Sequence, residues 1–136
     1  MANPHNSGGS SGFKVESELI AKWSELVMED GFTAIPNLLI DHLVDLQINP
    51  IELSVIIAIE RHRFFRGTAW PSNERIAELT GYSARHISRI ANELEQRNLL
   101  KIVHRAYRSN LYELDPLVRK LEQFKGKPLC STILTI

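Results

Sequence analysis

The chain has 136 residues, of which 43% are hydrophobic and 24% are charged, as in soluble globular domains. It contains no apolar run of the roughly 20 residues that a membrane-spanning helix needs, and no apolar signal-peptide core at its N-terminus. Cys130 is the only cysteine, which excludes an internal disulfide and a cysteine-based metal site. We therefore expect a cytoplasmic protein without a metal, a cofactor or a membrane partner.

The overall net charge of zero hides an uneven distribution of charge along the chain. Residues 1–60 carry a net charge of −7, residues 61–108 carry +6, and the remaining residues carry +1. Nine of the ten basic residues in the middle segment are arginines, and arginine suits bidentate contacts to phosphate and guanine better than lysine does. The middle segment is therefore either a surface that binds a polyanion or a solvated basic face, and charge alone does not decide between them.

The N-terminal part of the chain is predicted to contain a flexible tail and two helices. Residues 1–12 are rich in glycine, serine and asparagine, which is typical of a flexible tail. Apolar residues recur at helical spacing over residues 15–28, so we expect a helix there that ends near Gly31. Residues 37–46 are predicted to form another helix with Asn37 as its N-cap.

A strong helix start follows. Asn49 can act as the N-cap, Pro50 fits the first helical position, and Glu52 stands at the third. The helix is predicted to run to about Phe64. Its centre, residues 55–59, is apolar on nearly all sides, and we therefore expect it in the middle of the core.

Two short helices joined by a tight turn are predicted next. Ser72 can cap the first, over about Asn73–Thr80, and Ser83 can cap the second, over about Ala84–Arg97. Gly81 between them supplies a sharp turn with positive φ. Two helices in this arrangement are typical of a helix-turn-helix that reads DNA.

The pattern then changes to the alternation of a strand. Residues 99–105 and 110–114 are predicted to form a β-hairpin, or wing, and residues 117–124 a last helix. Residues 126–136 form an apolar tail of unknown role. The predicted fold is mainly α with a small β-hairpin wing, and residues 13–125 are expected to form one domain with extra N-terminal helices.

Three aromatic residues allow two interpretations each. Trp70 and Tyr82 flank the first helix of the pair, and we expect them to pack the turns as part of the core rather than to stack on bases. Trp23 lies on the N-terminal helix beside other apolar residues. Packing in the core and a homodimer face are both consistent with that position.

The second helix of the pair has an inner and an outer side. The inner side is formed by Ile87, Ile90, Ala91 and Leu94. On the outer side, Arg85 and Arg89 lie one turn apart near the N-terminus, the end that normally enters the major groove first, and each can pair with N7 and O6 of a guanine. The predicted base contacts are Arg85, His86, Ser88, Arg89 and Asn92. The alternative is that both arginines are surface residues that pair with Glu93.

Phosphate contacts are predicted at the helix starts and at the tip of the wing, where hydroxyl groups, backbone N–H groups and arginines concentrate. The predicted residues are Ser72, Asn73, Arg75, Ser83, Arg105, Tyr107, Arg108, Ser109 and Asn110. The alternatives are simple helix capping by the two serines and a polar hairpin loop.

Residues 32–114 resemble the winged helix-turn-helix of plasmid and phage replication initiators and of bacterial primosomal replication proteins. The resemblance rests on Pro71, Ser72, Ile76, Ala77, Thr80, Gly81, Tyr82, Ser83, Arg85, Ile87, Arg89, Leu94, Leu99 and Leu100, and on a lead-in that begins with Phe32-Thr33-Ala34-Ile35-Pro36. It implies DNA binding by residues 85–92 with assistance from residues 105–110. Unlike those proteins, the sequence shows no second domain for recruiting a helicase or a polymerase.

The expected function is sequence-specific binding of double-stranded DNA, in plasmid or phage replication initiation or in transcription regulation, since bacterial regulators share the same core. The alternative is a winged helix that acts as a protein-protein adaptor without reading DNA. An enzyme is not expected, because the sequence has no phosphate loop, nucleophile elbow or metal ligand set. The expected partners are duplex DNA and a second copy of the chain, bound through the N-terminal helix.

Overall fold

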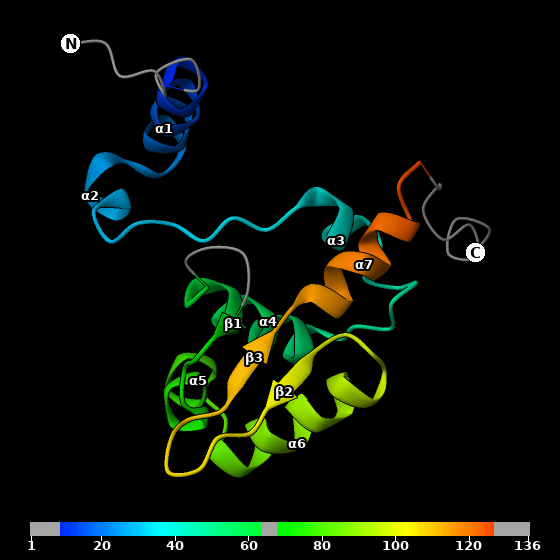
Figure 1. Ribbon diagram of the computed structural model, residues 1–136. Helices are drawn as coiled ribbons and strands as arrows, with labels where there is room; N and C mark the ends of the chain where they lie inside the picture. The colour runs from blue at the N-terminus through cyan, green and yellow to red at the C-terminus, as the bar shows by residue number, and fades with distance from the viewer. Residues whose placement is uncertain (1–8, 64–67, 127–136) are drawn as a thin grey trace. The chain divides into compact units, whose positions relative to one another are not determined.

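The computed structural model of the protein describes residues 9–63 and 68–126 (Figure 1). The chain divides between Phe32 and Thr33 into two compact units. The first unit contains α1 (Gly9–Trp23) and α2 (Glu25–Met28). The second contains α3 (Asn37–Asp41), α4 (Pro50–Arg61), β1 (Thr68–Ala69), α5 (Asn73–Thr80), α6 (Ala84–Gln96), β2 (Lys101–Val103), β3 (Leu111–Glu113) and α7 (Asp115–Gln123).

The first unit differs from its predicted form in two ways. The segment predicted to be flexible up to Gly12 is helical from Gly9, because extending an existing helix adds one backbone hydrogen bond for each residue fixed. Residues 1–8 lie outside the described part of the chain. The predicted continuous helix is interrupted at Ser24, whose φ of 81° is incompatible with a right-handed helix.

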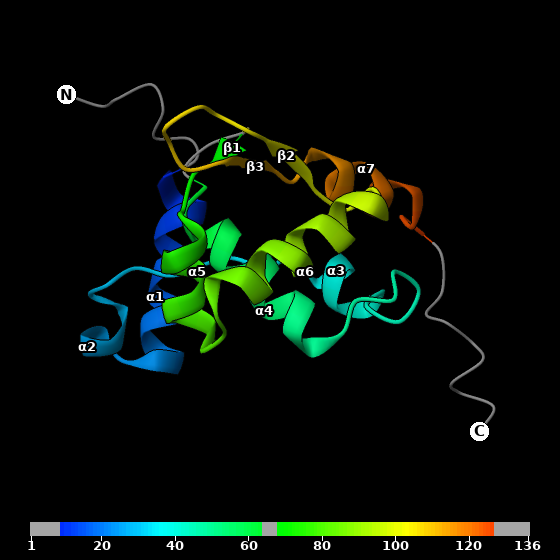
Figure 2. The ribbon, with the colours of Figure 1, turned by 90° about the horizontal axis from the view of Figure 1, so that it is seen from below.

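In the second unit, α5 and α6 pack against α4, and β2 lies along α6 (Figures 1 and 2). The three strands form an antiparallel sheet in the order β1-β3-β2, with Tyr112 opposite both Ala69 and Ile102. The predicted hairpin is therefore confirmed, with shorter strands than expected. A third strand, β1, had no counterpart among the predicted elements.

The core of the second unit forms around α4, where Val55, Ile56, Ala58 and Ile59 are all buried. Ile57 is 37% exposed, so the helix is not covered on every side. The predicted start of α4 is confirmed: Asn49 Oδ1 accepts from the Glu52 N–H at 2.8 Å, and the Asn49 N–H donates to Glu52 Oε1 at 3.0 Å. The helix ends at Arg61, and Phe64, its predicted last residue, lies outside the described residues.

The helix predicted for residues 37–46 is shorter than expected. It ends at Asp41, and Pro36 rather than Asn37 is its N-cap. His42, the first residue beyond it, is buried, stacks on Phe124 with ring centroids 4.6 Å apart, and bonds Asp45 Oδ2 through Nδ1 at 2.7 Å. This packing holds His42 at φ −117°, outside the helical conformation, and so ends α3.

The expectation that Trp70 packs in the core is wrong, because its side chain is 56% exposed. Its neighbours Ala69 and Pro71 are buried. In extended backbone, successive side chains point to opposite sides, so inward packing of both neighbours turns Trp70 outward. Tyr82 is half-buried and packs against the core as expected.

Candidate nucleic-acid interface

The α5–turn–α6 segment has the predicted local geometry. Ser72 Oγ accepts a hydrogen bond from the Arg75 N–H at 3.0 Å, and Ser83 Oγ accepts one from the His86 N–H at 3.1 Å, so both serines cap their helices. Gly81 has φ 81°, in the left-handed region that favours glycine. These local interactions fix the angle at which α6 leaves the turn.

The two sides of α6 differ in burial as predicted. Its inner side consists of Ile87, Ile90, Ala91 and Leu94, all buried in the core. On the other side, Arg85, Arg89 and Asn92 are exposed, whereas His86 and Ser88 are half-buried. The ring of His86 also packs edge-on against the ring of Tyr82, with the two ring centroids 4.8 Å apart. Because the inner side anchors the helix, the exposed side chains project from a fixed support.

Arg85 and Arg89 form no ion pair with any residue that the structure describes, so pairing with Glu93 is not observed. Arg75 contrasts with them, because its Nη1 lies 3.2 Å from Glu78 Oε2. An arginine without an internal carboxylate keeps its guanidinium for an external acceptor. The two outer arginines of α6 therefore have the chemistry that a base or phosphate contact requires.

A hollow of about 190 Å³ lies where the start of α5 meets the loop between β2 and β3. Its lining residues are Ser72, Asn73, Glu74, Arg108, Ser109 and Asn110. Five of these six residues were predicted as phosphate contacts from two separate stretches of sequence, and the fold brings them together. Glu74, which lines the same hollow, was not predicted from the sequence.

The other predicted phosphate contacts do not line this hollow. Arg75 is paired with Glu78, and Ser83 caps α6. Arg105 Nε donates to the Ser109 carbonyl at 2.8 Å, which closes the turn of the wing. Tyr107 stands fully exposed at the tip of this loop with φ 62°. Arg105 therefore shapes the wing, and Tyr107 projects from it.

Tyr112 was not predicted as a site residue, yet it bonds Asn73, which lines the hollow. Its buried hydroxyl donates to Asn73 Oδ1 and so ties β3 to the first residue of α5. Burial raises the pKa of Tyr112 above its ordinary value of 10.0; the side chain of Asn110 opposes this shift, and the charge of Glu74 adds to it. The alternation of the wing strand predicts that Tyr112 points inward, but its polar partner lies 39 residues away in sequence.

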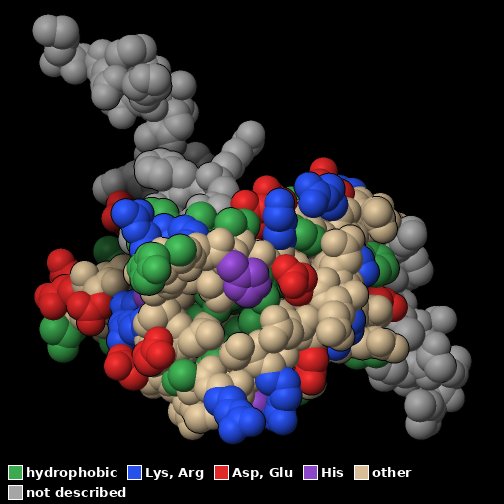
Figure 3. Space-filling model, turned by 60° about the horizontal axis from the view of Figure 1, so that its bottom comes forward, with side chains coloured by type: hydrophobic (Ala, Val, Ile, Leu, Met, Phe, Trp, Pro, Cys, Tyr) green, Lys and Arg blue, Asp and Glu red, His purple; other side chains and the backbone are tan. Residues whose placement is uncertain are grey.

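Charged side chains are interspersed on the side of the molecule that carries α6. In Figure 3, which brings the lower side of Figure 1 forward, lysine and arginine side chains stand in separate groups with acidic side chains between them. No continuous basic surface appears in this view. Recognition of a polyanion here would therefore depend on a few well-placed cations.

The described residues include no group of three or more histidine, cysteine, aspartate or glutamate residues placed to hold a metal ion. Within the same ranges, no helix combines the length and the apolar character needed to cross a bilayer.

Comparison with known protein families matches residues 46–100 to a family described as a helix-turn-helix domain. This segment includes α4, α5 and α6. Among solved structures, the chain is similar to the YusO protein from Bacillus subtilis, with 14% sequence identity, a TM-score of 0.44, and coverage of 93% of this chain and 83% of that one. No curated protein matches the chain. The helical core, the α5–turn–α6 segment and the antiparallel hairpin make this fold a winged helix-turn-helix.

Proposed function

We propose that the protein binds double-stranded DNA sequence-specifically, with α6 in the major groove. The observation that carries this proposal is the exposure of Arg85 and Arg89, one helical turn apart, on a helix whose opposite side is fixed in the core. Each guanidinium can donate two hydrogen bonds to N7 and O6 of a guanine. His86, Ser88 and Asn92 lie on or beside the same side and complete the set of proposed base contacts.

The phosphate contacts are proposed to come from the hollow between α5 and the wing. Ser72 and Asn73 lie at the N-terminus of α5, where backbone N–H groups and the helix dipole favour an anion. Arg108 faces them from the wing. Arg75, Ser83, Arg105 and Tyr107 are proposed to add contacts along the same DNA backbone. Such contacts supply affinity that depends on salt, whereas the base contacts supply specificity.

The biological role that we propose is replication initiation on plasmid or phage DNA, or transcription regulation, in the bacterial cytoplasm. The resemblance of residues 32–114 to replication initiators supports the first role. The match of residues 46–100 to a helix-turn-helix domain supports DNA binding in either role. In both, the protein acts as a binding protein rather than as an enzyme.

Substitution of Arg89 by alanine tests the proposed base contact. Arg89→Ala should weaken binding to the preferred sequence by about 1–3 kcal/mol, the cost of losing one bidentate base contact, and should affect random-sequence duplex less. Fluorescence anisotropy on both duplexes measures the two affinities. Arg119→Ala, which removes an exposed arginine from α7, is the matched control and should change neither. Equal losses on both duplexes would mean that Arg89 contacts phosphate only.

The exposed apolar residues of the first unit support a second component of the function, namely a protein partner. Trp23, Leu26 and Val27 are 60%, 76% and 57% exposed, and exposed apolar patches of this kind mark interaction surfaces. The partner that we propose is a second copy of the chain, which would give a homodimer that reads two half-sites about one helical turn apart, or a multiple of it. An adaptor that binds another protein through this surface is the competing function.

A further inference from the structure

A cavity of about 390 Å³ lies at the opposite end of α6 from the proposed base contacts. It is bounded by the C-terminal end of α6, by α7 and by the connection between α3 and α4. Its polar lining residues are Asp45, Gln47, Arg97, Lys120 and Gln123. The volume falls within the roughly 300–1,000 Å³ that small-molecule sites occupy. None of these residues belongs to the proposed DNA interface.

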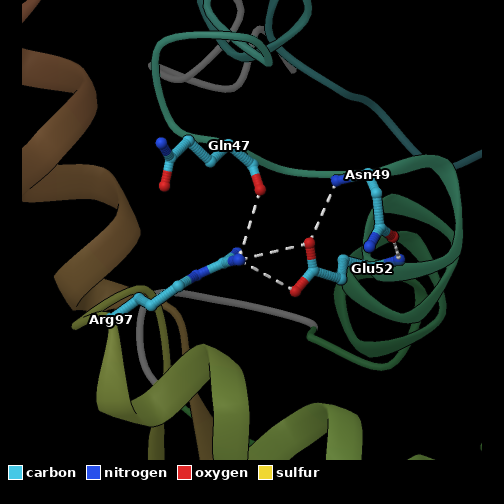
Figure 4. Close-up of polar contacts among 4 residues, drawn as sticks. All are labelled: Gln47, Asn49, Glu52 and Arg97. Carbon is cyan, nitrogen blue, oxygen red and sulfur yellow. Dashed lines mark hydrogen bonds and ion pairs between the residues drawn. The ribbon is translucent and has the colours of Figure 1, made fainter.

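Arg97 lines this cavity and has hydrogen-bond donors that no described residue uses. Its Nη1 donates to the Gln47 carbonyl at 3.2 Å and lies 3.1 Å from Glu52 Oε2 (Figure 4). Its Nε and Nη2 are buried and have no acceptor among the described residues. Buried N–H groups in proteins almost always have an acceptor. Neither nitrogen is exposed in this conformation, so an acceptor from outside the chain would reach them through a shift of the Arg97 side chain.

The other charges around the cavity determine which acceptor fits. Lys120 Nζ donates to the Arg97 carbonyl at 3.0 Å and has no carboxylate partner within the described residues. The Asp45 carboxylate is bound by His42 at 2.7 Å, and the Glu52 carboxylate is buried against Arg97. Two cations and two carboxylates balance, so long-range attraction for anions is weak here. Directed hydrogen bonds would then select a group with several acceptor oxygens, which matches the fork of a guanidinium.

The backbone at the cavity is also unusual. Gln47 has φ 56°, in the left-handed region that favours glycine or asparagine. Its carbonyl accepts the hydrogen bond from Arg97 described above. Strained backbone of this kind is concentrated at binding and switch sites.

The residues of the cavity also hold α6 in place. Arg97 is the C-cap of this helix, and Lys120 on α7 binds its carbonyl. Close by, the carboxylate of Glu95 accepts a hydrogen bond from the Ile102 N–H of β2 at 2.7 Å. A ligand that engages Arg97 and Lys120 would therefore act on the contacts that fix the end of the helix carrying Arg85 and Arg89.

We propose that this cavity binds a small molecule through a carboxylate or phosphate group held by Arg97 and Lys120, and that its occupancy changes how α6 binds DNA. The binding step is independent of the proposed function. The regulatory step rests on it.

Amide chemical shifts of the full chain, followed by NMR during titration with inorganic phosphate or with chloride at constant ionic strength, test the binding step. Phosphate should shift the amides of Gln47, Leu99 and Gln123, and chloride should not. Lys120→Met should weaken phosphate binding about tenfold, through loss of one charge-assisted hydrogen bond. Lys101→Met, which removes an exposed lysine of β2, should leave it unchanged.

Three outcomes would overturn the site: equal shifts with chloride, equal phosphate affinity in the Lys120 and Lys101 variants, or phosphate shifts confined to the hollow between α5 and the wing. If Lys120→Met perturbs the fold, Gln123→Leu on the exposed side of α7 takes its place, with at least a threefold loss expected. The location of the shifts in the unsubstituted protein tests the site without any variant.

The regulatory step has a separate readout. Phosphate at constant ionic strength should change the affinity for DNA in the unsubstituted protein by about threefold or more, and this change should disappear in the Lys120 variant. An identical effect of phosphate on both proteins would overturn the regulation. A protein that binds phosphate in the cavity but no DNA at any salt concentration would instead refute the proposed function alone.

Discussion

The arginines of this chain fall into two groups according to their partners. Arg63, Arg75 and Arg97 are bound by internal carboxylates, at 2.8, 3.2 and 3.1 Å from Glu60, Glu78 and Glu52 respectively. The second group has no ion-pair partner within residues 9–63 and 68–126 and consists of Arg61, Arg85, Arg89, Arg105, Arg108 and Arg119. Four of these six arginines lie on the outer side of α6 or at the wing. A count of arginines in the sequence does not separate the groups, because the partners are set by packing.

At the scale of single residues, Arg108 should behave differently from Arg89. Arg108 faces the N-terminus of α5 across the hollow, where a phosphate would lie. Arg108→Ala should therefore weaken binding to preferred and random duplexes by a similar factor and reduce the slope of log affinity against log salt by about 1. Anisotropy titrations over a range of salt concentrations measure both quantities. A loss confined to the preferred sequence would make Arg108 a base contact.

At the scale of elements, the sequence predicts the helix-turn-helix accurately because its signals are local. Ser72, Gly81 and Ser83 each determine one helix end through contacts within a few residues, and the apolar spacing of α6 fixes its buried side. By contrast, β1 has only two residues and is defined by its pairing with β3, more than 40 residues away in sequence. A local sequence pattern therefore does not predict it. The exposure of Trp70 follows from the same pairing.

For the candidate site, too, the sequence predicted the individual residues but not how they come together. Helix capping and the polarity of the wing pointed to Ser72 and Arg108 separately. Only the tertiary fold shows that they face one hollow, shared with Glu74. The Arg97–Glu52 contact escaped prediction for the same reason, since 45 residues separate the two side chains in sequence.

The buried hydroxyl of Tyr112, which bonds Asn73 and so joins β3 to α5, makes stability depend on pH. The pKa of Tyr112 is raised above 10.0, mainly by burial, so the folded protein holds this proton more tightly than the unfolded chain does. Its contribution to stability is complete below pH 10 and is lost as the pH rises above that value. Tyr112→Phe should lower the free energy of unfolding by about 1 kcal/mol at neutral pH and show a smaller decline under alkaline conditions.

Thermal unfolding of both proteins, followed by circular dichroism from neutral to alkaline pH, measures this difference. Groups other than Tyr112 titrate equally in the two proteins and cancel in the comparison. Parallel curves over the alkaline range would contradict the assigned role of the Tyr112 hydroxyl.

At the scale of the whole molecule, acidic residues predominate in the first 60 residues and basic residues in the segment that follows. The chain also divides into two compact units, at Phe32–Thr33. The periodicity of residues 15–28 predicted one helix with an apolar side, but the helix is interrupted at Ser24, and the pattern could not identify what covers its apolar residues. Periodicity indicates that one side of a helix is apolar, and the same spacing occurs in helices that pack in a core and in helices that form an interface. Trp23, which is 60% exposed, belongs to the second kind if the proposed homodimer forms.

Trp23→Glu tests that homodimer. Placing a charge in an apolar interface should raise the dissociation constant of the dimer by about tenfold or more. Size-exclusion chromatography with light scattering over a range of concentrations measures it. Ile40→Glu on α3, which alters another exposed apolar residue (52% exposed), is the control and should leave the dimer intact. A monomer at every concentration of the unsubstituted protein would rule the dimer out.

The central claim is that α6 reads a DNA sequence, and selection of bound duplexes from a random pool tests it most directly. The unsubstituted protein and the Arg85→Ala/Arg89→Ala double variant are compared at physiological salt. The account predicts that the unsubstituted protein enriches a motif containing guanine, and that the double variant keeps salt-dependent binding but loses enrichment at those positions. An absence of any motif with the unsubstituted protein, or the same motif with both proteins, would contradict it.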